Sequence, residues 1–224
     1  MRRGGTAQGI GVRTSVIRIN AGRTFIVTFA SRTIKDNTLQ ETHTIMSKNI
    51  LILSSSPRRG GNSDTLCDEF LRGALEAGHR AEKIFLRDKD IHPCLGCGAC
   101  SVHKKPCPQH DDAAAVIEKM LAADIIVMAT PVYFYAMSAQ MKALIDRCCG
   151  PYTEMRDKEF YFIATAAEDD DTIMDRIVAN FMGFLDCLEN PTVKGTVFCG
   201  GVWHVGEIKG NPKLAEAYEM GRQA

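Results

Sequence analysis

The chain has 224 residues, of which 45% are hydrophobic and 24% are charged, with 27 basic and 27 acidic side chains. This is an ordinary globular composition, and no stretch approaches the run of about 20 apolar residues that a membrane-spanning helix requires. Residues 1–45 hold seven Lys or Arg against two acidic residues, which leaves 20 basic and 25 acidic side chains for the rest. Because that body is mildly acidic, we expect no nucleic-acid partner, and because no long apolar run is present, we expect no membrane.

The first 45 residues differ in composition from the rest of the chain. They are rich in Arg, Thr and Ser and poor in acidic residues, which also fits an organelle transit peptide. Met46 is followed by SKNILILSSS, a polar start that runs directly into an apolar segment. We therefore expect residues 1–45 to be a disordered extension or a start assigned too far upstream, with a transit peptide as the alternative, and residues 46–224 to form one domain.

From Met46 onward, apolar strands alternate with amphipathic helices. Residues 50–53 form a continuous apolar run, as expected of a central parallel strand, and residues 66–74 keep helical spacing until Gly78, where the helix should stop. The same patterns predict strands at 81–86, 124–130, 160–165 and 192–199, and helices that begin near Asp111 or Asp112, after Ser138, at Asp171 or Thr172 (continuing to Leu188) and at Pro212. This alternation predicts an α/β fold with three layers, in which helices cover both faces of a doubly wound, parallel, five-stranded sheet.

Ligands of such sheets bind beyond the carboxyl ends of the strands. The loop after the first strand, SSSPRRGGNSDT at residues 54–65, leads directly into a helix. Its hydroxyl and amide groups, its glycines and its arginines suit a phosphate at the helix N-terminus. It is neither the G-x-G-x-x-G loop nor the Walker loop, so a nucleoside triphosphate is not implied. A polar turn that binds nothing is the alternative.

The loop of residues 92–110 carries four cysteines with the spacing C-x2-C-x2-C-x6-C. Two successive C-x-x-C turns can present three thiolates to an iron–sulfur cluster, and a further cysteine can close the site. Structural zinc loops usually bring two separate C-x-x-C pairs, and a disulfide framework would suit a chain with a secretory signal. We therefore expect a four-iron four-sulfur (4Fe-4S) cluster, with zinc or unmetallated thiols as alternatives. The cluster ligands would be Cys94, Cys97, Cys100 and Cys107, whereas Cys67, Cys148, Cys149, Cys187 and Cys199 are expected to pack in the core.

An aromatic segment follows the third strand. Pro131 and the trio Tyr133, Phe134 and Tyr135 leave the strand where the sheet changes its winding direction, so that a flat ring system could lie against them. Alone, such aromatic residues are more often part of a core or an interface. Together with the phosphate loop, they describe a site for FMN. Trp203, in a glycine-flanked loop after the last strand, either meets a neighbouring subunit or the substrate entrance, or belongs to a plain turn.

These segments resemble a known family. SSSPRRGGNSDTL and TPVYFYAMSAQMKALIDR are similar to the flavodoxin-like NAD(P)H-dependent FMN reductases, and the cysteine run between them resembles their iron–sulfur flavoprotein branch. The similarity extends through GTVFCGGVWHVGEIKGNP, so it covers nearly all of residues 46–224 and none of residues 1–45. The resemblance implies a flavodoxin-like sheet of strand order 2-1-3-4-5, FMN bound non-covalently, and a homodimer or homotetramer with the flavin near a subunit boundary.

The resemblance also implies roles for individual positions. No side chain is expected to be catalytic, because the flavin carries the chemistry. The phosphate and ribityl end of FMN would contact Ser54, Ser56, Arg58, Asn62, Ser63 and Thr65. The isoalloxazine ring would be lined by Pro131, Val132, Tyr133 and Phe134, partly through backbone N–H groups, with Thr165, Ala166 and Ala167 as a third contact loop.

The predicted function is that of a cytoplasmic FMN-dependent oxidoreductase. Its electrons would come from NAD(P)H, bound transiently against the flavin, or from a ferredoxin-like donor, and would pass to a small-molecule or protein acceptor. One alternative is an FMN-only NAD(P)H reductase of quinones, azo or nitro compounds that lacks a cluster. Others are a non-enzymatic electron carrier of flavodoxin type and a metal-binding or interaction module.

Overall fold

The structure is a computed structural model that describes residues 12–18, 24–30 and 47–224. The chain divides into two compact units, Met1–Thr44 and Ile45–Ala224. In the first unit, β1 (Val12–Arg18) and β2 (Thr24–Ala30) pair in antiparallel fashion. These two strands stand where the sequence indicated a disordered extension. The rest of that extension lies outside the described residues.

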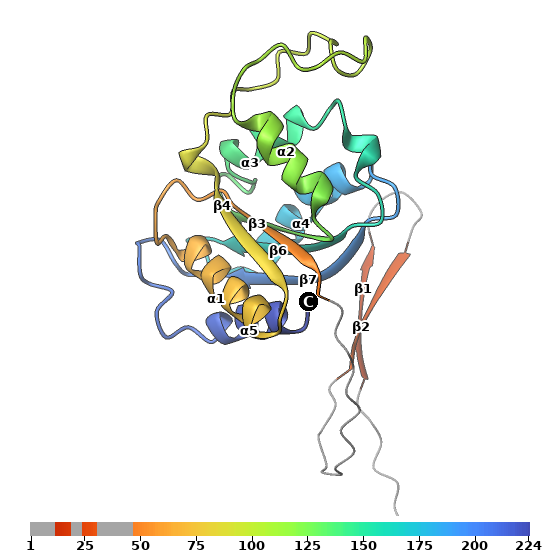
Figure 1. Ribbon diagram of the computed structural model, residues 1–224. Coiled ribbons are helices and arrows are strands. Elements are labelled where there is room, and N and C mark those ends of the chain that lie inside the picture. The colour runs from red at the N-terminus through yellow and green to blue at the C-terminus, as the bar shows by residue number, and fades with distance from the viewer. Residues whose placement is uncertain (1–11, 19–23, 31–46) are drawn as a thin grey trace, which may run out of the picture. The chain divides into compact units, whose positions relative to one another are not determined.

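The second unit is built on a parallel sheet (Figure 1). The loops expected to bind a ligand follow the carboxyl ends of these strands. Because the strands are parallel, those loops gather at one edge of the sheet. The spatial order, numbered along the domain, is second, first, third, fourth, fifth, and the predicted order 2-1-3-4-5 is therefore confirmed. In space the strands are β4 (Arg80–Phe85), β3 (Asn49–Ser54), β5 (Ile125–Pro131), β6 (Glu159–Thr165) and β7 (Thr192–Cys199).

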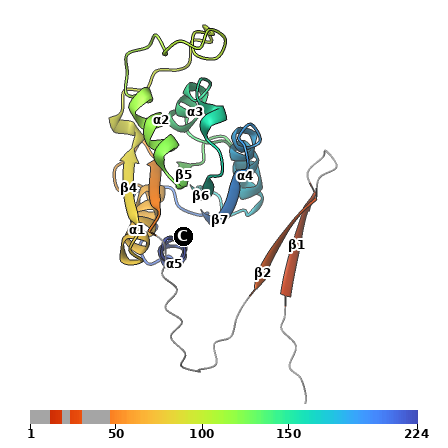
Figure 2. The same cartoon turned by 45° about the vertical axis from the view of Figure 1, so that its right-hand side comes forward.

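Helices cover both faces of this sheet, as predicted (Figures 1 and 2). One face carries α1 (Asn62–Glu76) and α5 (Lys213–Arg222). The other carries α2 (Ala113–Ala122), α3 (Ala139–Arg147) and α4 (Thr172–Leu185). Two short 3-10 turns, η1 (Leu86–Asp88) and η2 (Tyr152–Glu154), complete the described elements. None of the helices in the described part of the chain is long and apolar enough to cross a membrane.

The apolar strands supply two cores because their side chains alternate between the faces. Ile52 belongs to the buried cluster that includes Phe70 of α1, whereas its neighbour Leu53 belongs to the cluster that includes Met141 of α3. All four side chains are fully buried. This alternation anchors a helical layer on each face and leaves the carboxyl edge of the sheet to the loops.

Three details differ from the sequence-based expectations. Helix α4 ends at Leu185, so Leu188 is buried but lies beyond the helix. Cys149 and Cys187 are exposed, whereas both were expected in the core. Cys149 follows Cys148, the C-cap of α3, and Cys187 follows Asp186, the C-cap of α4. The helical spacing that placed both cysteines on an apolar face no longer applies beyond the end of a helix.

The remaining cysteines outside the loop behave as expected. Cys67, Cys148 and Cys199 are buried. Burial raises the pKa of the Cys148 thiol to about 12, and it raises the pKa of Cys67 as well. Both thiols are therefore protonated and unreactive near neutral pH.

Candidate functional site

A shallow hollow lies at the carboxyl edge of the sheet. Its cavity volume is about 60 Å³ inside and about 500 Å³ when the open mouth is included. The hollow is thus an open cradle that could hold one face of a flat molecule. Its walls come from the loops after β3, β5, β6 and β7: Ser56, Arg58, Gly61, Asn62, Ser63, Pro131, Val132, Tyr133, Thr165, Ala166, Ala167, Val202, Trp203 and Val205.

One end of the hollow is the N-terminus of α1. The N-cap is Gly61, which has no side chain to accept a hydrogen bond from the first turn. The first-turn N–H groups of a helix have no acceptor within the helix, so here they remain for a ligand. A Cβ added to Gly61 would lie 2.7 Å from Ser56 Oγ, and Gly60 has a φ of +62°. Both positions therefore require glycine, and the loop holds its tight turn against α1 for that reason.

Behind this loop, Asp64 of α1 forms a buried polar network. Its Oδ1 accepts a hydrogen bond from the Ser54 hydroxyl over 2.8 Å, and its Oδ2 accepts one from the Gly60 N–H over 3.0 Å. Lys83 of β4 places its Nζ 2.8 Å from Oδ1 and balances the carboxylate charge. Ser54 therefore supports the loop from behind and does not line the hollow, contrary to its expected phosphate contact.

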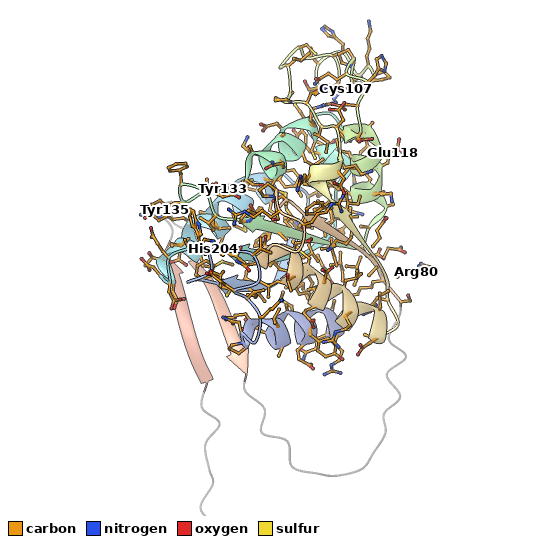
Figure 3. All side chains as sticks on the ribbon, turned by 90° about the vertical axis from the view of Figure 1, so that its left-hand side faces the viewer. Arg80, Cys107, Glu118, Tyr133, Tyr135 and His204 are labelled. Carbon is orange, nitrogen blue, oxygen red and sulfur yellow. The ribbon has the colours of Figure 1, made fainter. Side chains whose placement is uncertain are left out.

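Arg58 and Asn62 line the hollow and also hold its far wall. Arg58 Nη1 donates to the Trp203 carbonyl over 2.7 Å. Asn62 Nδ2 donates to the His204 carbonyl over 3.0 Å, and its Oδ1 accepts from the Ile208 N–H over 3.3 Å. The loop after β7 is thereby fastened to the start of α1. Figure 3 shows His204 on the same side of the domain as Tyr133.

The other end of the hollow is the aromatic segment after β5. Tyr133 and Ala136 exchange two backbone hydrogen bonds of 3.0 Å, which close a tight turn. The two residues at the tip, Phe134 and Tyr135, have φ values of +49° and +60°, which are unusual for bulky side chains. Such strain is often kept where a loop serves a binding site.

This turn bears on two details of the expected ring contacts. The N–H of Val132 donates to the Thr165 carbonyl over 2.8 Å, and the N–H of Tyr133 donates to Ala136, so neither N–H is free for a flavin. Phe134 is fully exposed and does not line the hollow. The tight turn sends its side chain into solvent, which no pattern in the sequence indicated.

Most of the residues expected at a cofactor meet in the hollow. These are Ser56, Arg58, Asn62, Ser63, Pro131, Val132, Tyr133, Thr165 and Ala166, with Ala167 beside them. Thr65 does not: its hydroxyl donates over 3.1 Å to the carbonyl of Gly61, the N-cap of α1. Val202 and Val205 also line the hollow, although no pattern in the sequence indicated them, and Trp203 lines it where the sequence left a plain turn as an alternative. The glycines that flank this loop could have indicated a turn at the carboxyl edge of the sheet, but they do not indicate that the loop forms a wall of the hollow.

The cysteine loop leaves the same edge of the sheet, between η1 and α2, and projects from the domain at the top of Figure 1. Its two ends are clamped by the guanidinium of Arg147, at the end of α3. Arg147 Nη1 donates to the His92 carbonyl over 2.9 Å, and Arg147 Nη2 donates to Asp111 Oδ1 over 3.0 Å. The side chains of Asp111 and Arg147 are almost completely buried.

Charge and hydrogen bonding within the clamp favour the ionised pair. The hydrogen bond from the Arg147 guanidinium is the main cause that lowers the pKa of Asp111 to about 2. Burial acts in the opposite direction, and hydrogen bonds from the N–H groups of His92 and Ala113 lower the pKa further. The same pairing raises the pKa of Arg147. The clamp is thus charged at neutral pH and fixes where the cysteine loop begins and ends.

The thiols of the loop suit an iron–sulfur cluster chemically, because all four cysteines lie in one segment with no disulfide between them. Cys107 Sγ lies 3.4 Å from Arg147 Nη2, and Cys100 packs beside Gly150. Cys94 and Cys97 are exposed. Within residues 47–224, however, no three His, Cys, Asp or Glu side chains converge as a metal site would require. The structure therefore shows the donor set but not an assembled site.

Known proteins match this fold and these segments. The sequence profile of the NADPH-dependent FMN reductase family matches residues 48–199. The iron–sulfur flavoprotein MJ1083 of Methanocaldococcus jannaschii is 43% identical over 98 residues, which are 44% of this chain and 50% of the relative. An FMN-dependent NADH:quinone oxidoreductase of Pseudomonas putida is 29% identical over 111 residues, 45% of this chain and 55% of the relative. The solved NAD(P)H:quinone oxidoreductase from Methanothermobacter marburgensis superposes with a TM-score of 0.62 at 20% identity, over 80% of this chain and 96% of that one.

The extent of these matches differs. The chain spans about half the length of the curated relatives that it matches, and the likeness to the solved structure is one of fold. The family profile covers more than half of the chain and contains the phosphate loop, the cysteine loop and the aromatic segment. The chain belongs to the NADPH-dependent FMN reductase family.

Proposed function

We propose that this protein is an FMN-dependent oxidoreductase that takes electrons from a nicotinamide nucleotide. The observation that carries the proposal is the hollow at the carboxyl edge of the sheet, which has an uncapped helix N-terminus at one end and Tyr133 at the other. A phosphate joined to a flat ring matches those two ends. The family to which the chain belongs supports the same cofactor.

The phosphate end is suited to a dianion. The first turn of α1 offers backbone N–H groups, Ser63 adds a buried hydroxyl, and Arg58 adds a positive charge. Lys83 neutralises Asp64 behind the loop, so the phosphate would not face an uncompensated carboxylate. These groups would bind and orient FMN without taking part in electron transfer.

The ring end is open. Because the hollow is shallow, a ring held against Pro131, Val132 and Tyr133 would keep one face accessible to a nicotinamide ring and then to an acceptor. FMN, when bound, supplies the hydride and electron chemistry. The residues of the hollow would contribute orientation and shielding of the other ring face. Quinones are a reasonable acceptor class, because one relative is named a quinone oxidoreductase.

We further propose that Cys94, Cys97, Cys100 and Cys107 hold a 4Fe-4S cluster. The spacing of the four thiols and the similarity to the iron–sulfur flavoprotein MJ1083 support this proposal. The clamp between Asp111 and Arg147 would hold both ends of the loop while the thiols converge. A ferredoxin-like donor, a protein acceptor, a homodimer or homotetramer and a cytoplasmic location belong to the same proposal.

The flavin proposal is tested by titrating the purified full chain with FMN and following the quenching of flavin fluorescence. Oxidation of NADPH by the loaded protein is then measured with a quinone as acceptor. We expect tight FMN binding and NADPH turnover that depends on added FMN. The control is Arg80→Ala, which removes an exposed arginine that lies far from Tyr133 in Figure 3. Failure of the full chain to bind FMN would refute the proposal, and binding without NADPH turnover would favour an electron carrier.

A further inference from the structure

The segment from Val202 to Ile208 forms one wall of the hollow, yet it lies beyond the residues that the family profile matches. We propose that Arg58 couples a phosphate bound at the N-terminus of α1 to the position of Trp203. This inference rests on the proposed function in one respect, namely that the hollow receives the phosphate of FMN. It adds a role for the segment that follows β7.

The segment is held partly by bonds within itself. Glu207 accepts hydrogen bonds from the N–H of Trp203 over 2.6 Å and from the N–H of His204 over 2.9 Å. These two bonds lower the pKa of Glu207, so the carboxylate is ionised at neutral pH. They define a compact turn, but they do not connect it to the hollow.

The Val202 N–H makes that connection through the backbone, since it donates to the Ala166 carbonyl over 2.9 Å. Two side chains also make it, and they differ in the further bonds that they can form. Asn62 uses both its amide nitrogen and its amide oxygen on the segment. Arg58 uses Nη1 on the Trp203 carbonyl over 2.7 Å. A guanidinium carries five N–H donors, so its Nε–Nη2 edge can meet a phosphate while Nη1 keeps the carbonyl. Arg58 is therefore the side chain through which a phosphate can act on the segment.

A phosphate on Arg58 would restrict the arginine more than a neutral carbonyl does. Charge-assisted hydrogen bonds to phosphate are roughly twice as strong as neutral ones, and two parallel bonds fix the plane of the guanidinium. Fixing that plane also fixes the bond to the Trp203 carbonyl. The Trp203 side chain, which is 61% exposed, would then be held at the mouth of the hollow more firmly than without phosphate.

The coupling must work in both directions. If phosphate binding stabilises the segment, a stabilised segment strengthens phosphate binding by the same factor. Glu207 does not line the hollow, but it maintains the turn that presents the Trp203 carbonyl. It is therefore a positioning residue, and its loss should weaken binding of FMN more than binding of riboflavin, which lacks the phosphate.

Trp203 is the single tryptophan of the sequence, so its fluorescence reports on this segment alone. The experiment measures acrylamide quenching of the full chain without flavin, with and without inorganic phosphate, against chloride at equal ionic strength. Because no flavin ring is present, neither stacking nor energy transfer can mimic the effect. We expect phosphate to lower the quenching constant about two-fold in the wild type and in Arg80→Ala, but not in Arg58→Ala.

A second measurement compares FMN with riboflavin by flavin fluorescence. Glu207→Ala should weaken FMN about five-fold and leave riboflavin nearly unchanged, the size expected of a modest coupling. The inference is overturned if FMN binds but phosphate leaves Trp203 quenching unchanged, if phosphate protects Arg58→Ala equally, or if Glu207→Ala weakens both flavins alike. Protection by phosphate through Arg58 in a chain that binds no FMN would support the coupling and contradict the flavin proposal instead.

Discussion

Asp64 and Lys83 meet behind the phosphate loop, with 2.8 Å between Lys83 Nζ and Asp64 Oδ1. Asp64 is nearly buried, and Lys83 is the cation closest to it, although it also contacts the more exposed Asp68. A buried carboxylate so close to the proposed phosphate site costs free energy unless a cation balances its charge. The pair lets one carboxylate organise the loop without repelling an anionic ligand.

Removing one partner of this pair should cost more than removing both. Lys83→Met leaves Asp64 buried and unpaired, and we expect a loss of about 3 kcal/mol in the free energy of unfolding, measured with urea. The double variant Lys83→Met with Asp64→Asn should recover part of that loss. The matched control is Asp68→Ala, which breaks only the exposed pair and should cost less than about 1 kcal/mol. Equal losses for Lys83→Met and Asp68→Ala would contradict this account.

Ser63→Ala tests the phosphate end of the hollow. The hydroxyl is buried and lines the hollow, so we expect its removal to weaken FMN by about 1.5 to 3 kcal/mol, the range for a hydrogen bond to a charged group. Riboflavin affinity and thermal stability should change little. Ser101→Ala, in the cysteine loop, is the control. If Ser63→Ala binds FMN as the wild type does, the phosphate is bound elsewhere.

The clamp at the cysteine loop predicts a pH dependence. The pKa of Asp111 is about 2 in the folded protein against its usual 3.8, so the unfolded chain binds the proton more readily. The stabilisation is therefore complete above about pH 4 and is lost as the pH falls toward 2, by about 1 to 2 kcal/mol. Urea unfolding at several pH values should show this extra loss in the wild type and not in Asp111→Asn. Parallel curves for the two proteins would show that the pair does not stabilise the folded state.

The four loop cysteines should behave as a set if they hold a cluster. After anaerobic reconstitution, Cys→Ser at position 94, 97, 100 or 107 should lower iron and sulfide content, while FMN stays bound. Cys149→Ser and Cys187→Ser are matched controls, because both thiols are exposed like those of Cys94 and Cys97. They should leave the iron content unchanged. Wild-type protein that binds zinc, or no metal at all, would leave the FMN-only reductase as the better description.

Residues 1–45 are predicted to be dispensable for the domain that follows. The compact unit Ile45–Ala224 contains the whole parallel sheet and both candidate sites. A chain that starts at Met46 should therefore match the full chain in melting temperature and in bound FMN. A clear drop in melting temperature after truncation would mean that residues 1–45 stabilise the domain.

The sequence predicted the sheet well because β3 and β5 are buried on both faces, and a strand in that position must be almost wholly apolar. The same argument placed the phosphate loop and the aromatic segment at one edge. The sequence pattern could not show that the Ser54 hydroxyl donates to Asp64, that the Asn62 amide bonds to the segment after β7, or that the Phe134 side chain is exposed to solvent. The Asn62 bonds join residues far apart in the chain, and the other two features depend on how individual loops turn, neither of which periodicity encodes.

Helix α3 has a consequence for the spacing of the two candidate sites. At its start, the Ser138 hydroxyl lies 2.9 Å from Ser55 Oγ, and the Ser138 N–H donates to Thr130 Oγ1 over 2.8 Å, directly behind the hollow. At its end, Arg147 holds the cysteine loop. Nine helical residues rise about 14 Å. Helix α3 is thus one rigid element that sets the distance from the base of the hollow to the ends of the cysteine loop. A glycine or proline inserted into α3 would therefore disturb both candidate sites at once.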